Sequence, residues 1–598
     1  MKLHALKERG LALWRTPLGK VLAAALLLRL TGLTWGLPSY DGWDNDGVAP
    51  RDFLVGVLDT YWPGHHYTYP PFHLLLLTLA EAPVWLSAIA RAPALVPAAV
   101  VHTFIGVPTM TAMAVIARAI AIALSLGLLW NLAAIGTLLR EGEPTDQTDQ
   151  TGRAGRAGRA GRAGRAGRAG AWVAVACGLN AVLTYYSQTT NLDVPYLFWS
   201  VLALRWLVHA VARRAPRSLR RAMVFAALGV ATKDQAYALF VLGVPLSLGA
   251  WLVLDPEARR LTPALLRELG FGIAIGLPLL LVIDGAVTNP AGFRDRVAYL
   301  LGPASQDFAY YPPTWAGRLK VASDTLLSFD QFYPWAFALL AAAGVVVACR
   351  APDRARRAAG LVPLFAAVSF IVTFDMSARR SEHRFALPQM VLFGVYAGLA
   401  LDELNARFAA TRRWAFAVGV APVLLYALFK CVAVDVAMIL DPRYDAERWM
   451  RERVRPGDAI EIYGSNVHLP RLPADARIRR VDVDGVEGRN PILGVTEVSD
   501  RFSNVEARRP RFIIQPAIWS LRYFVEPSWA ASTGQTLSPG QARIEGDLDS
   551  RNYFHALLEG RLGYKLAHVS RWTSTFWPQV DVHASLTREI WLFERTGE

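Results

Sequence analysis

VLAAALLLRLTGLTWGLPSYDGWDNDG, residues 21–47, joins a nearly continuous apolar run to a segment with three aspartates. The apolar run covers about residues 19–37, long enough as a helix to cross the hydrocarbon core of a bilayer, which is roughly 30 Å thick. Basic residues precede the run, which contains Arg29 and lacks a small-residue cleavage site. It is therefore predicted to be an uncleaved transmembrane helix with its N-terminus in the cytoplasm.

The composition extends this interpretation to the whole chain. The 598 residues are 53% hydrophobic, which is too apolar for a series of soluble domains and too long for one soluble core. The net charge of +14 comes from basic residues in short loops between apolar runs, which favours a lipid bilayer and excludes nucleic acid as partner. Cys177, Cys349 and Cys431 all lie in apolar runs, which excludes a disulfide framework or a thiolate metal site. The chain is predicted to be an α-helical polytopic membrane protein.

Five clusters of arginine set the expected orientation, because loops rich in Lys and Arg stay in the cytoplasm. They lie at 140–168, 213–221, 259–267, 350–357 and 407–413. Placing all five in the cytoplasm requires about eleven crossings and puts the C-terminus outside. The predicted spans are residues 19–37, 117–139, 171–187, 194–212, 222–232, 235–254, 268–287, 332–349, 359–375, 384–402 and 414–434.

The same orientation assigns the segments between the spans of this 1–440 transmembrane domain. Residues 38–116 form the first outer loop, in which 71–91 is predicted to be an interfacial or re-entrant helix. Residues 288–331 form a second outer loop. Residues 141–170, which include six copies of Gly-Arg-Ala, are predicted to be a disordered cytoplasmic insert because they have no large apolar side chain to bury.

Residues 441–598 differ from the rest in their mixed charge. RERVRPGDAIEIYG, residues 451–464, is typical of a helix, a turn and a strand, while RPRFIIQP at 509–516 and REIWLFER at 588–595 predict further strands. A small α/β domain outside the cytoplasm is expected.

Asp44 and Asp46 are the first candidates for catalysis. They lie on the outer side among aromatic residues, namely Trp43, Tyr61, Trp62, Tyr67 and Tyr69, and YTYPPF at 67–72 then turns the chain back toward the bilayer. An aromatic-walled pocket at the interface would partly desolvate a carboxylate there and make it a general base for a hydroxyl. An aromatic belt around an incidental acidic turn is the alternative, and the sequence leaves both open.

Further ionisable residues fall at the outer ends of later spans. Asp193 precedes Val194 and Pro195 as a helix N-cap would. The short span at 222–232 is about 16 Å of helix, so Lys233 and Asp234 are expected at a turn sunk below the outer surface, as an ion pair or as functional groups. SARRSEHRF, residues 377–385, adds Arg379, Arg380, Glu382, His383 and Arg384. Tyr310 and Tyr311, in the second outer loop, are expected to cover a substrate site.

Carboxylates and cations on one membrane face fit a lipid-linked phosphosugar. Displacing a lipid phosphate from an anomeric carbon requires a base for the acceptor hydroxyl and cations for the departing phosphate. Each kind of group is present on the predicted outer side. His65 and His66 are the metal candidates beside the aspartates, but adjacent histidines rarely bind one ion together, and no metal or other cofactor is expected.

At this point the sequence resembles the GT-C class of polytopic glycosyltransferases, especially bacterial relatives of protein O-mannosyltransferases and lipid A aminoarabinose transferases. GWDND with YTYPPF is similar to the acidic motif and YPP-like turn of the class, with Asp44 in the place of its catalytic aspartate. DND replaces the usual Asp-Glu pair of that motif, which leaves the choice between Asp44 and Asp46 as the base open. LDVPYLFW, ATKDQAY and EHRFALP are similar to three later motifs, and the order matches over residues 19–434. Tyr69 stands where aminoarabinose transferases have lysine, which argues against that substrate.

The resemblance implies an inverting transfer of a sugar from a polyprenyl-phosphate donor, undecaprenyl phosphate in a bacterial inner membrane, to an unknown extracytoplasmic acceptor. It implies Asp44 as the base, Asp46 and Asp193 as support or acceptor-binding groups, and Lys233 and Arg384 as phosphate clamps, with Arg379, Arg380 and His383 as weaker candidates. A secondary transporter or lipid flippase, and a non-catalytic membrane scaffold, are the alternatives. A transporter would have internal repeats and ionisable groups near the bilayer midplane, and the sequence shows no such repeat.

Overall fold

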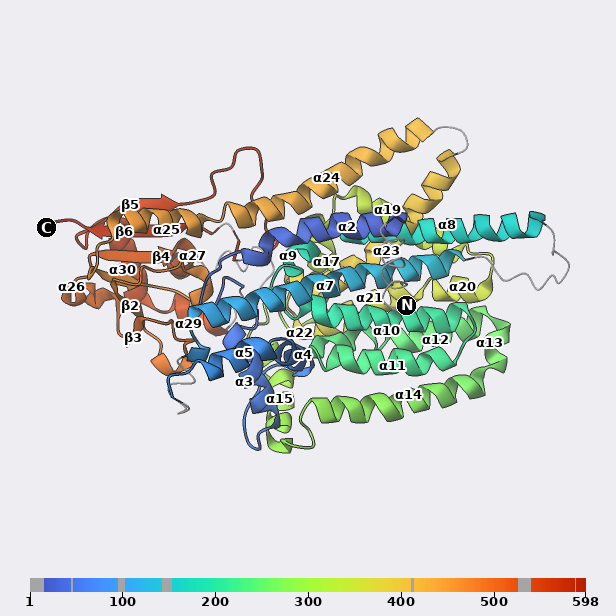
Figure 1. Ribbon diagram of the computed structural model, residues 1–598, viewed down its shortest axis with the longest axis horizontal. Helices are drawn as coiled ribbons and strands as arrows, with labels where there is room; N and C mark the ends of the chain where they lie inside the picture. The colour runs from blue at the N-terminus through green and yellow to red at the C-terminus, as the bar shows by residue number, and fades with distance from the viewer. Residues whose placement is uncertain are drawn as a thin grey trace.

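The computed structural model describes residues 15–44, 47–94, 103–141, 153–409, 413–524, 539–583, 585–586 and 588–597. Long helices run roughly parallel in one elongated bundle, and a sheet domain built from the C-terminal residues lies at one end of it (Figure 1). The predicted fold class, a polytopic helical protein with a C-terminal α/β domain, is confirmed.

The helices of the bundle follow the apolar runs of the sequence. They are α2 (Pro17–Leu30), α3 (Pro50–Tyr61), α4 (Phe72–Ala80), α5 (Ala82–Ala90), α7 (Val107–Arg140), α8 (Arg153–Gly178), α9 (Ala181–Tyr186), α10 (Asp193–Ala212), α11 (Arg217–Val230), α12 (Gly243–Leu254), α13 (Pro256–Arg260), α14 (Thr262–Ile283), α15 (Pro290–Leu301), α16 (Pro303–Gln306), α17 (Trp315–Leu327), α18 (Phe329–Phe332), α19 (Ala336–Cys349), α20 (Arg354–Ala359), α21 (Val362–Phe370), α22 (Met376–Ala378), α23 (His383–Ala409) and α24 (Arg413–Ile439). Three short helical segments, η1 (Thr31–Thr34), η2 (Asp234–Leu239) and the π-helix η3 (Ile371–Asp375), continue α2, precede α12 and follow α21.

Eight helices in the described residues are long and apolar enough to cross a membrane, or up to ten if each of two bent pairs is one span. The sequence predicts about eleven. Residues 171–187 fall on the end of α8 and on α9, and residues 222–232 fall on α11, which has only 14 residues. Neither segment is a span by length and hydropathy, because Gly-Arg-Ala residues extend the first and the second is short.

The two bent pairs correspond to predicted features. α4 and α5 are bent by 58° relative to each other at Glu81. A bend of this size is expected of a broken span or of the re-entrant helix predicted for residues 71–91. The helical stretch Trp315–Phe332 meets α19 at 111°, so α17 runs across the direction of the bundle. Residues 288–331 are therefore not an extended loop but a set of short helices, α15 to α18, each of which begins at a proline or an N-cap threonine or serine.

The arginine clusters lie at one end of the bundle, as the orientation rule requires. Arg214, after α10, forms ion pairs with Asp255 after α12 at 2.9 Å and with Asp353 after α19 at 3.0 Å. Arg140, at the end of α7, pairs with Glu403 of α23 at 2.7 Å. Figure 1 shows α13 and α20 at the end away from the sheet domain.

The Gly-Arg-Ala repeat differs from its predicted disorder. Residues 153–170 are the first part of α8, because Ala and Arg are good helix formers and the helix continues into an apolar segment. Ala166 and Ala169 are buried. A Cβ added at Gly170 would lie 2.4 Å from Oγ1 of Thr137, so a glycine lets α8 approach α7 closely.

The C-terminal domain is a six-stranded sheet in the order β3-β2-β1-β4-β6-β5. The strands are β1 (Ala459–Ile462), β2 (Arg477–Asp482), β3 (Val495–Ser499), β4 (Phe512–Pro516), β5 (Tyr564–Ser570) and β6 (Ile590–Arg595), and the helices are α25 (Pro442–Arg453), α26 (Val505–Arg508), α27 (Ala517–Leu521), α29 (Pro539–Glu545) and α30 (Leu548–Leu558). β1 to β4 are parallel to one another, whereas β6 and β5 add antiparallel strands. The three predicted strand segments are β1, β4 and β6.

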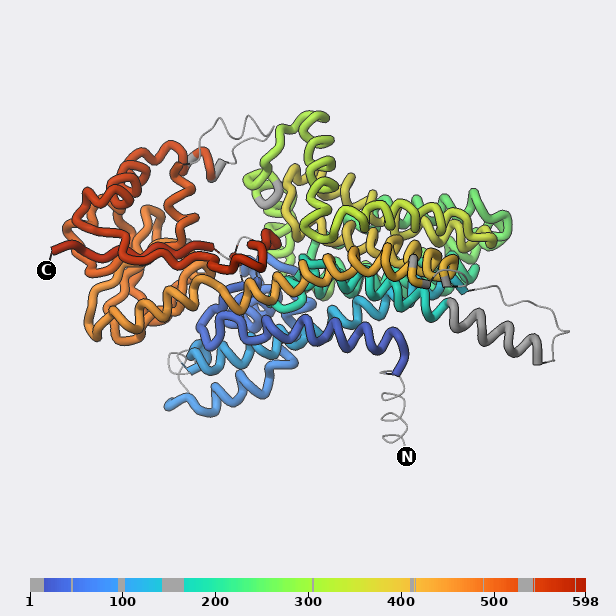
Figure 2. The backbone as a smooth tube through the Cα atoms, turned by 90° about the horizontal axis from the view of Figure 1, so that it is seen from above, coloured from blue at the N-terminus to red at the C-terminus, as the bar shows by residue number. Residues whose placement is uncertain are grey.

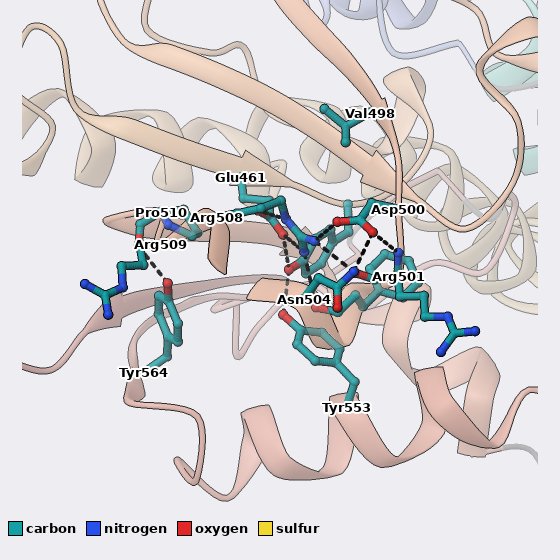
Figure 3. Close-up of polar contacts among 12 residues, drawn as sticks. Glu461, Val498, Asp500, Arg501, Asn504, Arg508, Arg509, Pro510, Tyr553 and Tyr564 are labelled. Carbon is teal, nitrogen blue, oxygen red and sulfur yellow. Dashed lines mark hydrogen bonds and ion pairs between the residues drawn. The ribbon is translucent and has the colours of Figure 1, made fainter. Parts of the chain in front are cut away.

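A buried ionic cluster holds this domain together (Figure 3). Arg508 of α26 donates both to Glu461 of β1, at 2.8 Å to each carboxylate oxygen, and to Asp500 after β3. Tyr463 donates to Glu461 at 2.7 Å. Burial raises the pKa of Tyr463. Burial alone would lower the pKa of Arg508, but its hydrogen bonds to Glu461 and the charge of that carboxylate raise the pKa above its usual value. The cluster is satisfied within the domain, so its role is structural.

Two parts of the C-terminal domain contact the membrane bundle. The indole of Trp35 donates to Asp441 at 3.2 Å, and the backbone N–H of Gly36 donates to the hydroxyl of Tyr444 at 3.0 Å. The β5–β6 connection, residues 571–589, extends toward the bundle (Figure 2), where Val582 and Leu586 are 2% exposed within the core of the bundle. The domain is thereby held against the end of the bundle that carries the predicted outer residues.

Candidate functional site

Asp44 is buried at the junction of the first outer loop and the segment between α9 and α10. Its Oδ2 accepts hydrogen bonds from both the backbone N–H and the hydroxyl of Thr190, each at 3.0 Å, and lies 3.4 Å from Nη2 of Arg118. Its Oδ1 is buried and has no hydrogen-bond partner in the described part of the chain. Because a buried acceptor without a donor is costly, Oδ1 is the atom available to a ligand hydroxyl.

Arg118 holds this corner in place from within α7. Its side chain is fully buried, and Nη1 donates to the backbone carbonyls of Gly32, Leu33 and Trp35 at 3.2, 3.1 and 2.7 Å. These carbonyls end the first span, so one guanidinium satisfies a helix end and also faces the Asp44 carboxylate. Sequence analysis did not select Arg118, although an arginine inside the 117–139 apolar run was a signal for it.

A glycine allows the outer loop to approach the 187–193 segment. A Cβ added at Gly47 would lie 2.6 Å from Oγ1 of Thr190 and 2.8 Å from Cβ of Asp44. Only glycine fits between these two side chains without moving one of them.

Asp193 follows Thr190 by three residues, a distance of at most about 11 Å along the chain, and is also buried. Its Oδ1 accepts from Nζ of Lys233 at 2.8 Å and from Nε2 of Gln235 at 3.4 Å, while its Oδ2 has no hydrogen-bond partner among the described residues. The predicted N-cap role is wrong, because α10 begins at Asp193 itself and its cap residue Leu192 makes no side-chain cap bond. The side chain bonds Lys233 instead.

Lys233 lies beside Tyr196. Its Nζ is 5.7 Å from the centre of the Tyr196 ring, whose hydroxyl accepts from Gln235 at 3.0 Å. The structure therefore brings Asp193 and Lys233 into direct contact, and residues 190–193 connect them along the chain to the support of Asp44.

Arg380, Glu382 and Arg384 form a second charged group at the start of α23. Glu382 pairs with Nη2 of Arg380 and, at 2.8 Å, with Nε of Arg384. Both guanidinium groups also lie over the ring of Phe385, at 5.3 and 4.8 Å. One carboxylate between two arginines leaves this group with a net positive charge.

Asp375 is a buried carboxylate that sequence analysis missed. It ends the π-helix η3, and its Oδ2 accepts from Nε2 of Gln389 at 2.6 Å, while its Oδ1 has no partner in the described residues. An aspartate at the outer end of the predicted 359–375 span was the available signal. π-helical turns occur often at functional sites.

Asp234 and Lys233 do not pair with each other. Asp234 forms an ion pair with Arg296 of α15, which is 1% exposed and lies 3.5 Å from Asp284. Burial raises the pKa of Asp284 to about 7, although the Arg296 charge opposes the shift. Burial likewise raises the pKa of Tyr67, which donates to the backbone carbonyl of Asp284, to about 12. This second ionic cluster connects α15 to the first residue of η2 and to the end of α14.

Arg379, Tyr310 and Tyr311 form a structural junction. Arg379 donates to the carbonyl of Tyr311 at 2.8 Å and to the side chain of Gln306 at 2.6 Å, and its own carbonyl accepts from the N–H of Tyr310 at 3.0 Å. Tyr311 is 2% exposed and donates to Asp324 at 2.8 Å. These contacts hold the α16–α17 connection against the segment before α23.

His383 contacts the C-terminal domain. Its ring lies edge-on to Phe332 with centroids 6.1 Å apart, and it hydrogen-bonds to the backbone of Val582. His583, one residue further, stacks on Tyr185 with centroids 5.1 Å apart. The β5–β6 connection therefore lies between α23 and the end of α9.

The aromatic residues near the aspartates have different surroundings. Trp43 is 1% exposed and packs under Arg443 of the C-terminal domain, whose guanidinium is 4.2 Å from the ring. Tyr61 donates to the carbonyl of Ile283 at 2.8 Å, and Trp62 is exposed. Tyr69 packs against the small core of α3 and α4. Trp43 and Tyr61 are thus held by a domain contact and a helix end, and the aromatic-walled pocket stays a prediction.

The remaining candidates from the sequence are the possible metal ligands His65 and His66, and Asp46. The described residues contain no group of three or more His, Cys, Asp and Glu side chains that could hold a metal ion. His65 bonds Asp59 at 2.9 Å, and the ring of His66 lies edge-on to Tyr299. Asp46 lies outside the described residues.

Comparisons with known proteins give similarity in structure only. No family model and no curated protein matches the chain. The similar solved structures include two of ArnT from Cupriavidus metallidurans, a GT-C aminoarabinose transferase. The one bound to undecaprenyl phosphate is 16% identical, with a TM-score of 0.42 over 84% of this chain and 94% of that one. The apo structure is also 16% identical, with a TM-score of 0.44 over 84% of this chain and 93% of that one.

Proposed function

We propose that the protein is an inverting glycosyltransferase that moves a sugar from a polyprenyl-phosphate donor, undecaprenyl phosphate in a bacterial inner membrane, to an acceptor outside the cytoplasm. One observation carries the proposal. Asp44 and Asp193 are both buried, and each has one carboxylate oxygen without a donor among the described residues. Lys233, one of the two cations that the reaction requires, donates to the other oxygen of Asp193 at 2.8 Å. Arg384, the second cation, lies at the start of α23.

Asp44 acts as the general base. The acceptor hydroxyl binds at Oδ1, while Thr190 and Arg118 hold Oδ2 and so fix the direction in which Oδ1 points. As the acceptor oxygen forms its bond to the anomeric carbon, its proton passes to Oδ1. The bond from the anomeric carbon to the phosphate oxygen breaks at the same time, and its electron pair leaves with the lipid phosphate. A single displacement of this kind inverts the anomeric carbon.

Lys233 and Arg384 stabilise the departing phosphate. Each is paired with a carboxylate, Asp193 or Glu382, at 2.8 Å. A donor phosphate would compete with these carboxylates for the cations and free Asp193 to accept a hydrogen bond from a sugar or acceptor hydroxyl. Charge-assisted bonds to a developing phosphate dianion are stronger than those to the monoanionic phosphodiester of the donor, so the clamp favours the transition state.

The orientation belongs to the same proposal. The arginine-rich end of the bundle faces the cytoplasm together with the N-terminus, and the Asp44 end and the C-terminal domain face outward.

The proposed glycosyltransfer is tested by incubating purified protein with polyprenyl-phosphate sugars and acceptor extracts and then measuring free polyprenyl phosphate. Release that depends on acceptor supports the proposal. A protein that binds every donor but releases no lipid phosphate refutes it.

A further inference from the structure

The strand order of the C-terminal sheet reverses between β1 and β4. From β1 the chain moves outward through β2 to β3, then returns to β4 on the other side of β1. Ligands of open parallel sheets bind outside the carboxyl ends of the strands near such a reversal of order. β6 runs antiparallel to β4, with Ile590 opposite Pro516, so the β5–β6 connection leaves from and returns to this same edge.

A cavity of about 250 Å³ lies at this edge, beside the carboxyl end of β4. We name it the sheet-edge cavity. Its lining comes from the α27 segment after β4 and from both ends of the β5–β6 connection: Ala517, Ile518, Leu521, Arg571, Trp572, Gln579, Arg588 and Glu589.

The lining combines the features that bind an anionic saccharide. Apolar side chains of α27 and the indole of Trp572 offer surface for the C–H face of a sugar ring. Gln579 and Arg571 are exposed side chains with hydrogen-bond donors. The carboxylate of the lining, Glu589, accepts from the indole of Trp591 at 3.2 Å. The exposed guanidinium of Arg571 favours a carboxylate or phosphate on the ligand.

The same connection reaches the proposed catalytic residues. Arg443 donates to the carbonyl of Ser585 at 2.8 Å, and His583 stacks on Tyr185 of α9. Tyr185 lies five residues before Thr190, whose N–H and hydroxyl bond Asp44. A ligand in the sheet-edge cavity would therefore contact a segment that packs directly on the support of the proposed base.

We infer that the sheet-edge cavity binds the acceptor, and that the acceptor is a saccharide that carries a carboxylate or a phosphate. The role as acceptor rests on the proposed glycosyltransfer, whereas the binding of an anionic saccharide does not. The C-terminal domain then holds the acceptor chain while the membrane domain holds the lipid donor.

Calorimetric titration of full-length protein in detergent tests the site. The probes are digalacturonate for a carboxylate, glucose 6-phosphate for a phosphate and lactose as the neutral saccharide. We expect one of the two anionic probes to bind at least about tenfold more tightly than lactose, and Arg571→Gln to remove most of that difference. Gln579→Ala should weaken all binding. Arg561→Gln, which changes an exposed arginine elsewhere in the domain, should leave the affinities unchanged.

Equal affinity for lactose and both anionic probes, no binding of any probe, or unchanged binding by Arg571→Gln would each overturn the inference. Release of polyprenyl phosphate from a donor is measured separately on the same preparations. Turnover without saccharide binding would reject the cavity and leave the proposed function standing. Saccharide binding without any donor turnover would reject the proposed function and retain the binding site.

Discussion

Thr190 donates two hydrogen bonds, one from its backbone and one from its hydroxyl, to a single oxygen of Asp44 at 3.0 Å each. The other oxygen of that carboxylate is buried and has no donor among the described residues. This arrangement separates the carboxylate into one atom that the protein holds and one atom that a substrate can use.

Replacing the Thr190 hydroxyl should weaken catalysis without changing the fold. Thr190→Val keeps the side-chain shape but loses one hydrogen bond to a charged acceptor, so we expect kcat to fall about tenfold. Thr190→Ser keeps the hydroxyl and should retain most activity. Turnover of a polyprenyl-phosphate sugar by the two variants measures the effect. Equal activity of Thr190→Val and the unchanged protein would show that Asp44 needs no such support.

Lys233 should act on the donor phosphate. Lys233→Met removes a cation and leaves Asp193 buried with only Gln235 as donor, so the KM for the donor should rise about tenfold or more. Lys233→Arg should recover part of the loss. The control is Lys320→Met, which changes a half-exposed lysine paired with Asp324 on α17. A Lys233→Met variant with an unchanged donor KM contradicts the clamp.

Strong sequence patterns predicted the fold and one side of the site. Apolar runs placed most spans, and RPRFIIQP and REIWLFER became β4 and β6 because short apolar segments between charged ends favour strands. Asp44 was selected for its aromatic neighbours and Asp193 for its place at the outer end of a span. Lys233 was selected because ionisable groups at membrane depth are rare, and Arg384 because arginines on the outer side indicate an anionic ligand. Their pairing was not predictable, since Asp234 bonds Arg296, 62 residues away, instead of its neighbour Lys233.

Other features depended on tertiary contacts with no local signal. Arg118 and Asp375 act through partners on other helices, Gly32 to Trp35 for the first and Gln389 for the second. The Gly-Arg-Ala repeat has no apolar pattern, yet its last residues pack on α7 because small side chains permit close approach. The sequence around Trp43 is typical of an aromatic belt at the membrane interface, but its ring packs under Arg443 of the C-terminal domain, 400 positions later in the chain.

Asp284 should make stability depend on pH. Its pKa is about 7 in the folded protein against 3.8 unfolded, so the protonated form is favoured by folding. Its contribution is present in full below about pH 4 and is lost as pH rises through 7. Asp284→Asn should therefore flatten the fall in Tm between these values, measured by thermal unfolding of purified protein. Asp295→Asn, at an exposed position nearby, serves as control and should follow the unchanged protein. An identical decline in Asp284→Asn would argue against the shift.

Arg508 should be essential for the stability of the C-terminal domain. Arg508→Met leaves Glu461 charged and buried, which costs roughly 3–5 kcal/mol. Adding Glu461→Gln removes that charge and should recover part of the loss. Arg501→Met is a matched control, because the Arg501 side chain points away from the cluster in Figure 3. Thermal unfolding of the three proteins compares them, and a double variant less stable than Arg508→Met would contradict this explanation.

Asp44→Asn tests the central claim most directly, through the release of free polyprenyl phosphate from a polyprenyl-phosphate sugar in the presence of acceptor. The amide keeps the size of the side chain and removes the base, so turnover should fall by roughly 10²–10⁴-fold while donor binding stays unchanged. Turnover within a few-fold of the unchanged protein would show that Asp44 is not the base and would contradict the account.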